Sequence, residues 1–239
     1  MKPEVILALD VPNSAAVPPI LAKLPPQLMW MKIGLELFTA SGPDIVRTLS
    51  QDKRNIFLDL KLHDIPRTVA NAVSVAGTLG VSLMTVHAIG GKAMLEAAAD
   101  AAKSFGPNRP RLVAVTTLTS LNQQDFTDLG IGRSMTDQAL KLTELALQAG
   151  IDGVVTSVLE AAALRKAFGP EPILVTPGIR PAGSAVGDQK RVATPAGAVE
   201  AGASYLVVGR PIMEAADPAQ ATRDIQAEIS QAWNKLKTA

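Results

Sequence analysis

A short run of charged residues at the end of an apolar segment is the part of the sequence best suited to chemistry. The segment Asn55–Leu60 is apolar enough for a buried strand, and residues 61–66 continue it as KLHDIP. Because strand side chains alternate, Asp59 and Lys61 are expected on one face. A buried charge is costly unless it is paired, so two opposite charges at this point indicate a functional site. The alternative is a surface salt bridge where the strand enters a loop.

The rest of the chain alternates between short apolar runs and alanine-rich helical segments, and we count eight such units in 239 residues. The expected strands are Val5–Leu9, Met29–Ile33, Asn55–Leu60, Ser82–Val86, Leu112–Thr116, Asp152–Thr156, Ile173–Thr176 and Tyr205–Val208. The expected helices include Asp64–Leu79, Lys92–Phe105, Thr136–Gln148, Leu159–Phe168, Pro195–Ala201 and Pro218–Leu236. Such alternation requires a parallel sheet.

Two parallel architectures fit this alternation. A closed (β/α)8 barrel typically needs about 250 residues. An open doubly wound sheet is the alternative, but the glycine-rich dinucleotide fingerprint is missing after the first strand. No stretch of the sequence suggests a domain boundary. We therefore expect an α/β protein built as a single (β/α)8 TIM barrel over residues 1–239.

A barrel gives the charged residues a common location, because functional groups of this fold gather at the carboxyl ends of its strands. Charged residues lie at the end of each of the first three predicted strands. Because side chains alternate along a strand, these charges are expected on equivalent faces of the three strands. The four residues are Asp10, Lys32, Asp59 and Lys61. Four charges of alternating sign can keep a lysine protonated and both carboxylates ionised. The pattern therefore predicts one charged site at the barrel mouth.

Composition excludes several classes of function. The chain has 23 basic and 22 acidic residues spread along its length, so nucleic acid and anionic membrane are not expected partners. The absence of cysteine rules out disulfides and thiolate metal sites. No apolar run approaches the roughly 20 residues of a membrane span, and no terminal segment is typical of secretion. A cytoplasmic location is expected.

Two histidines and a threonine lie near the predicted mouth. His87 and Thr119 follow the fourth and fifth strands, but a single histidine is most simply a hydrogen-bonded residue at the edge of the core. His63 could orient its charged neighbours. A metal site built from both histidines and the aspartates is conceivable, but no usual ligand spacing supports it. The polar connection Leu121–Thr136 is expected to be an exposed loop with a short helix around Gln123–Leu129.

The last quarter of the chain suits phosphate binding. The seventh strand is followed by Thr176–Pro181, and the eighth by Gly209-Arg210-Pro211. Barrels often bind phosphate with these two loops, through backbone N–H groups and an arginine that makes paired hydrogen bonds. The segment Arg180–Arg191 is long enough to act as a lid over a bound phosphate. The alternative is a surface loop with scattered basic residues.

The sequence resembles the orotidine 5′-phosphate decarboxylase family over essentially its full length. The motifs that carry the resemblance are Leu7–Asp10, Lys32–Gly34, Asp59–Pro66, Leu118–Ser120, Pro177–Arg180 with Gln189, and Gly209-Arg210. Related sugar-phosphate barrels also have the D-x-K-x-x-D signature, so the combination of motifs is more specific than that signature alone. The resemblance implies decarboxylation of orotidine 5′-phosphate to UMP, the last step of de novo pyrimidine nucleotide synthesis, without cofactor or metal.

The resemblance also implies roles for individual residues. Lys61 is expected to donate a proton to C6 of the pyrimidine, and the catalytic group is Lys61, Asp59, Asp64 and Lys32. Substrate binding is expected from Asp10, Lys32, Ile65, Thr68, Thr119, Pro177, Arg180, Gln189, Gly209 and Arg210. The family forms homodimers with shared active sites, so Asp64, Ile65 and Thr68 are expected to serve the partner's site. Arg67 departs from the asparagine of many relatives and lies beside that interface.

Two other functions fit parts of the same pattern. A 3-keto-gulonate 6-phosphate decarboxylase or hexulose-phosphate synthase would use a divalent metal and an enediolate intermediate. A non-catalytic barrel that binds a phosphorylated ligand would tolerate loss of Lys61.

Overall fold

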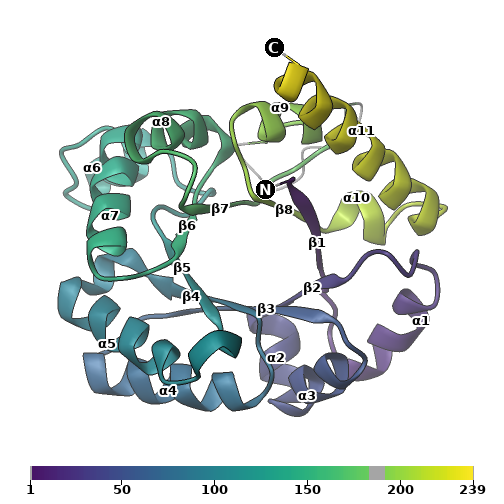
Figure 1. Ribbon diagram of the computed structural model, residues 1–239, viewed down its shortest axis with the longest axis horizontal. Helices are drawn as coiled ribbons and strands as arrows, with labels where there is room; N and C mark the ends of the chain where they lie inside the picture. Colours follow the sequence, from purple (N-terminus) through teal and green to yellow (C-terminus); the bar gives the residue numbers. More distant parts are fainter. Residues whose placement is uncertain (1, 183–191, 239) are drawn as a thin grey trace.

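Eight parallel strands close into a barrel in their sequence order (Figure 1). The structure is a computed structural model that describes residues 2–182 and 192–238. The strands are β1 (Glu4–Ala8), β2 (Trp30–Gly34), β3 (Asn55–Leu62), β4 (Leu83–His87), β5 (Arg111–Val115), β6 (Gly153–Val155), β7 (Ile173–Thr176) and β8 (Tyr205–Val208). The expected α/β fold, a (β/α)8 barrel, is confirmed.

The helices form an outer ring around the strands (Figure 1). They are α1 (Val17–Leu21), α2 (Leu35–Ser41), α3 (Asp44–Gln51), α4 (Pro66–Thr78), α5 (Lys92–Lys103), α6 (Gln123–Asp128), α7 (Met135–Gln148), α8 (Val158–Phe168), α9 (Pro195–Glu200), α10 (Arg210–Met213) and α11 (Pro218–Thr238). Short 3-10 turns cover Ser14–Ala16, Ala88–Gly90 and Gly106–Asn108. In the part of the chain described, no helix is both long and apolar enough to cross a bilayer.

Alternation along the strands divides the apolar residues between two cores. The inner core fills the barrel with Ile6, Ala8, Trp30, Phe57, Leu83, Val113, Val115, Val155, Ile173, Val175, Tyr205 and Val207. Their neighbours along the strands, such as Val5 and Leu7 of β1, instead pack in the outer core beneath the helices. Within the barrel, the rings of Trp30 and Tyr205 pack in a T-shaped arrangement, with their centroids 4.9 Å apart. The two-residue periodicity read from the sequence is therefore confirmed in β1 and β2.

Element boundaries differ from expectation around the charged stretch. β3 extends to Leu62, two residues beyond the predicted Leu60, and α4 begins at Pro66 rather than Asp64. Proline favours the first helical position, because it has no N–H to leave unpaired, and it disfavours helical backbone in the residue before it. Asp64 therefore lies in the turn before the helix. Four short helices, α1, α2, α3 and α10, were not predicted from the sequence.

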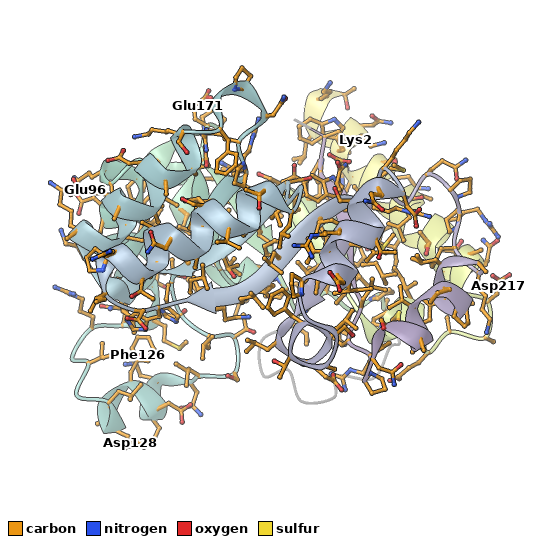
Figure 2. The ribbon with its side chains drawn as sticks, turned by 90° about the horizontal axis from the view of Figure 1, so that it is seen from below. Lys2, Glu96, Phe126, Asp128, Glu171 and Asp217 are labelled. Atoms are coloured by element: carbon orange, nitrogen blue, oxygen red, sulfur yellow. The ribbon has the colours of Figure 1, made fainter. Side chains whose placement is uncertain are left out.

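The two ends of the barrel carry different structures. Lys2 and Glu171, which precede β1 and β7, lie at one end, and Phe126 and Asp128 of α6 lie at the other (Figure 2). The expected short helix in the polar connection is confirmed as α6, whose first turn is capped by the side chain of Asn122. The end marked by α6 is the end where the strands finish.

Candidate active site

A cavity of about 730 Å³ opens at the carboxyl ends of the strands. All four charged residues predicted at the mouth line this cavity: Asp10, Lys32, Asp59 and Lys61. Thr119, which follows β5, also lines it. The sequence prediction that the first three strands deliver their charges to one site is confirmed.

The four charges, called here the charge array, form a chain of opposite signs. Lys32 Nζ lies 2.9 Å from Asp10 Oδ1 and 3.9 Å from Asp59 Oδ2. Lys61 Nζ in turn lies 2.9 Å from Asp59 Oδ1. The Asp59 side chain is 14% exposed and that of Lys61 is 32% exposed, so both are partly withdrawn from water. An ammonium held in this way can stabilise negative charge that develops on a bound molecule.

Local backbone geometry sets the position of the two lysines. Lys61 has a φ of +52°, in the left-handed region that side chains other than glycine rarely adopt. Opposite it, the regular pairing of β3 with β4 is interrupted after Leu58 and resumes at Leu62. On β2, a Cβ on Gly34 would lie only 2.8 Å from Lys32 Nζ, so glycine keeps space for that ammonium group. The charges therefore depend on backbone features that simple strand alternation does not describe.

The loops after β7 and β8 lie on the rim of the same cavity. Pro177, Gly178 and Arg180 line it from one loop, and Gly209 and Arg210 from the other. We call these two segments, Pro177–Arg180 and Gly209-Arg210, the phosphate loops, after the role predicted for them from the sequence. Their arginines face a cavity that also contains the charge array, as expected from the sequence. The prediction for Gln189, and most of the lid predicted over Arg180–Arg191, falls outside the described residues.

Backbone hydrogen bonds fix the base of the first phosphate loop. Ile179 pairs with Ala193 in an isolated parallel bridge, and the Arg180 N–H donates to the Ala193 carbonyl at 2.8 Å. Arg180 is 9% exposed, and its guanidinium donates to the Ile179 carbonyl at 2.8 Å. The arginine is therefore largely buried at the cavity wall.

The three residues expected to act in trans do not line the cavity. Asp64, Ile65 and Thr68 are exposed at the start of α4, and Ile65 is 66% exposed. The Asp64 carboxylate accepts a hydrogen bond from the Ile65 N–H at 2.6 Å. Thus Asp59 and Lys61 face the cavity of their own barrel, whereas Asp64 and its neighbours are displayed on the surface beside it.

The two histidines stack on each other and do not line the cavity. Their ring centroids are 5.4 Å apart. His87 Nδ1 finds no hydrogen-bond partner among residues 2–182 and 192–238, so the expectation of a hydrogen-bonded histidine is wrong for this atom. Burial lowers the pKa of His87, and electrostatic repulsion between its protonated form and the neighbouring His63 and Lys61 side chains lowers it further. Within the same residues, no three His, Asp or Glu side chains are grouped to hold a metal ion.

The lowered pKa of His87 predicts a pH dependence of stability. The unfolded chain takes up a proton at the ordinary histidine pKa, whereas the folded chain resists protonation until lower pH, so acidification favours unfolding. We expect the unfolding free energy to fall between about pH 7.5 and about pH 5.5, and to fall less in His87→Gln. Urea unfolding of both proteins at both pH values measures this. An identical pH dependence in the two proteins would contradict the prediction.

Several residues of the cavity were not singled out as site residues in the sequence. Phe57, Val155 and Val207 form part of its floor, and Met213 and Glu214 of the segment after β8 form part of its wall. Strand alternation places Phe57 on the face of Asp59, and this signal could have identified it. Met213 is the last residue of the short helix α10 and Glu214 follows it, and no pattern in the sequence marks either residue.

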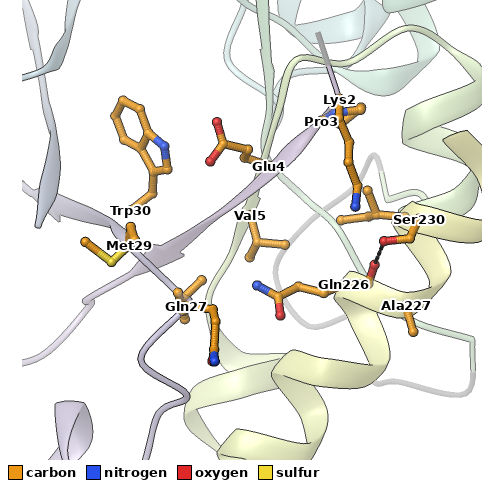
Figure 3. Close-up of a pocket in the computed structure, with 12 residues that line it drawn as sticks. Lys2, Pro3, Glu4, Val5, Gln27, Met29, Trp30, Gln226, Ala227 and Ser230 are labelled. Atoms are coloured by element: carbon orange, nitrogen blue, oxygen red, sulfur yellow. Dashed lines mark hydrogen bonds between the residues drawn. The ribbon is translucent and has the colours of Figure 1, made fainter.

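A second cavity, of about 620 Å³, lies at the opposite end of the barrel (Figure 3). Its lining includes Lys2, which precedes β1, Glu4 at the start of β1, and Gln226 of α11. Figure 3 shows Gln226 and Ser230 on successive turns of α11, where the Ser230 hydroxyl donates a hydrogen bond to the Gln226 backbone carbonyl. Since functional groups of (β/α)8 barrels gather at the carboxyl ends of strands, the cavity with the charge array is the candidate active site.

Fold and cavity together define a (β/α)8 barrel with a lysine–carboxylate array and arginine-bearing loops at its carboxyl end. The chain belongs to the family described as Orotidine 5′-phosphate decarboxylase / HUMPS family, whose sequence profile matches residues 3–225.

Similar proteins support this assignment. A protein of Photobacterium profundum named orotidine 5′-phosphate decarboxylase is 47% identical over 231 residues, which cover 97% of this chain and 98% of that one. One of the same name from Moorella thermoacetica is 50% identical over 95% of this chain and 92% of its own length. The crystal structure of orotidine 5′-phosphate decarboxylase from Lactobacillus acidophilus superimposes with a TM-score of 0.85 and 39% identity, covering 96% of this chain and 99% of that one.

Proposed function

We propose that this protein decarboxylates orotidine 5′-phosphate to UMP, with Lys61 as the catalytic acid. The observation that carries the proposal is the Lys61 ammonium held 2.9 Å from Asp59 in a cavity whose rim bears Arg180 and Arg210. Family membership and the names of the relatives support a carboxy-lyase of pyrimidine synthesis. The proposed enzyme is a single barrel domain that acts in the cytoplasm.

The chemical step requires a fixed positive charge. When the bond from C6 to the carboxylate breaks, CO2 leaves and the electron pair remains on C6, where the ring π-system cannot delocalise it. The Lys61 ammonium stabilises this carbanion and then transfers a proton from Nζ to C6, giving UMP. Asp59, next to the departing carboxylate, would disfavour the bound substrate relative to the transition state. Lysine thus supplies both the charge and the proton, and the proposed reaction uses no cofactor or metal.

Substrate binding is assigned to the remaining parts of the cavity. Arg180, Gln189, Gly209 and Arg210 would hold the phosphate, with Pro177 shaping the loop and Thr119 contacting the pyrimidine. Asp10 and Lys32 complete the charge array and bind the substrate beside it. A phosphate bound far from C6 can supply binding energy that orients the ring.

The proposed active enzyme is a homodimer with shared sites. Asp64, Ile65 and Thr68 are exposed and lie outside the cavity of their own chain, which supports a role in the partner's site. The exposed Ile65 and Ile89, 66% and 54% accessible, supply apolar surface near this region. Arg67 is exposed between Ile65 and Thr68 and would lie at the subunit interface.

The proposed function predicts turnover of orotidine 5′-phosphate that a chelator does not reduce. Loss of the substrate's ultraviolet absorbance, followed with purified protein in the presence and absence of EDTA, measures this directly. Turnover of sugar phosphates that EDTA abolishes, with no turnover of orotidine 5′-phosphate, would instead indicate a metal-dependent barrel of the hexulose-phosphate synthase type. Binding of UMP without turnover of either substrate would indicate a non-catalytic binding protein.

A further inference from the structure

Thr85 of β4 joins Asp59 and Lys61, two neighbouring members of the charge array, through its side-chain hydroxyl. Its hydroxyl accepts a hydrogen bond from the Lys61 backbone N–H at 2.7 Å and lies 3.1 Å from Asp59 Oδ1, to which it donates. The same Asp59 oxygen accepts from Lys61 Nζ at 2.9 Å. Thr85 is fully buried and does not line the cavity. One buried hydroxyl that is not part of the cavity lining therefore contacts both residues.

The β3–β4 pairing explains why a side chain is needed here. Leu58 pairs with Met84, and the next pair is Leu62 with Val86, so residues 59–61 lie opposite Thr85 alone. Thr85 alone cannot form regular backbone hydrogen bonds with three residues of β3, so the strand bulges at this point. Within the bulge, Lys61 has a φ of +52°. The Thr85 hydroxyl supplies the acceptor that the Lys61 N–H needs in this conformation. It thereby holds the bulge in place.

The hydrogen-bonding capacity of the hydroxyl matches this position. A threonine hydroxyl has one proton to donate and lone pairs to accept, and Thr85 uses the proton for a carboxylate and a lone pair for an amide. Valine has nearly the same shape but can do neither. Serine lacks the methyl group but can do both.

We propose that Thr85 is a positioning residue, whose buried hydroxyl fixes the Lys61 backbone and the Asp59 carboxylate so that the Lys61 ammonium is aligned for its substrate. This inference rests on the proposed decarboxylase function for its effect on turnover. It does not rest on that function for its effect on the Lys61 backbone.

The kinetic test compares Thr85→Val with Thr85→Ser. Misplacing a reacting group by about 1 Å can cost about 100-fold in rate, so we expect kcat of Thr85→Val to fall by about ten- to a hundredfold. KM should change by less than about threefold, because the phosphate loops are untouched. Thr85→Ser should retain most of the activity. Thr143→Val, which removes another buried hydroxyl on the outer helix α7, should match the unmutated protein.

Should Thr85→Val fail to fold, the activities of Thr85→Ala and Thr85→Ser can be compared instead, because these two smaller side chains differ only in the hydroxyl. A kcat of Thr85→Val equal to that of the unmutated protein, equal losses in the serine and valine variants, or a change in KM alone would each overturn the proposal.

A second measurement does not require activity. Hydrogen exchange of the Lys61 amide, followed by NMR, should be at least about tenfold faster in Thr85→Val or Thr85→Ala than in Thr85→Ser or the unmutated protein, because the amide loses its acceptor. Equal exchange rates would overturn the positioning role. If the unmutated protein does not turn over orotidine 5′-phosphate, the proposed function fails, and amide exchange still decides the role of Thr85.

Discussion

Replacing Lys61 by alanine is expected to lower the rate of CO2 release by about 10⁴-fold or more. Loss of an electrostatic group at a developing charge typically costs about 10²- to 10³-fold, and loss of a general acid about 10²- to 10⁴-fold. Lys61 is proposed to serve in both capacities. UMP binding should be largely retained, because Arg180, Arg210 and Thr119 remain in the cavity.

Single-turnover CO2 release and calorimetric binding of UMP measure the two properties separately. Lys141→Ala is the matched control, since this exposed lysine pairs with Glu144 on α7 and should have no effect on either property. If Lys61→Ala kept more than about a tenth of the rate, Lys61 could not supply both charge and proton.

Mixing two inactive variants is expected to restore activity. If Asp64 serves the partner's site, a heterodimer of Lys61→Ala and Asp64→Ala subunits has one site with both residues intact. Random pairing in a twofold dimer makes half of the molecules heterodimers with one intact site of two, so about a quarter of full activity should return. Each variant alone should be strongly impaired. Turnover after joint unfolding and refolding of the two proteins measures the recovery.

The structure supplies a matched control for this experiment. Asp59 and Lys61 line the cavity of the same barrel, with Nζ and Oδ1 2.9 Å apart. A heterodimer of Lys61→Ala and Asp59→Ala subunits therefore has no intact site, and its mixture should recover nothing. Absence of recovery in the Asp64 mixture, with active unmutated dimers refolded in parallel, would contradict the shared site. Equal recovery in both mixtures would contradict the assignment of Asp59 to its own barrel.

The barrel was predictable because its signal is repeated along the chain. Each strand is a short apolar run, each is followed by a helical segment, and eight repeats of this pattern leave few alternatives. Errors were confined to boundaries and short elements. At Pro66, the preference of proline for the first helical position outweighed the helical composition that suggested a start at Asp64.

Convergence of the charge array was also predictable from strand alternation and barrel topology. Asp10, Lys32 and Asp59 are each near a strand end, and parallel strands in a barrel bring those ends together. The same logic assigned the phosphate loops to the rim. Alternation did not predict how Lys61 meets Asp59, because the bulge in β3 departs from the regular period on which that argument depends.

The sequence by itself determined which side chains reach the barrel mouth, since periodicity and element order are local properties of the chain. Only the tertiary structure decided how those side chains are held. The Thr85 hydroxyl lies between Asp59 and Lys61, and His87 Nδ1 has no hydrogen-bond partner within the described residues 2–182 and 192–238; both features arise where β3 and β4 lie side by side. Contacts between residues more than twenty positions apart depend on strand register and backbone geometry, and no local pattern in the sequence specifies either one.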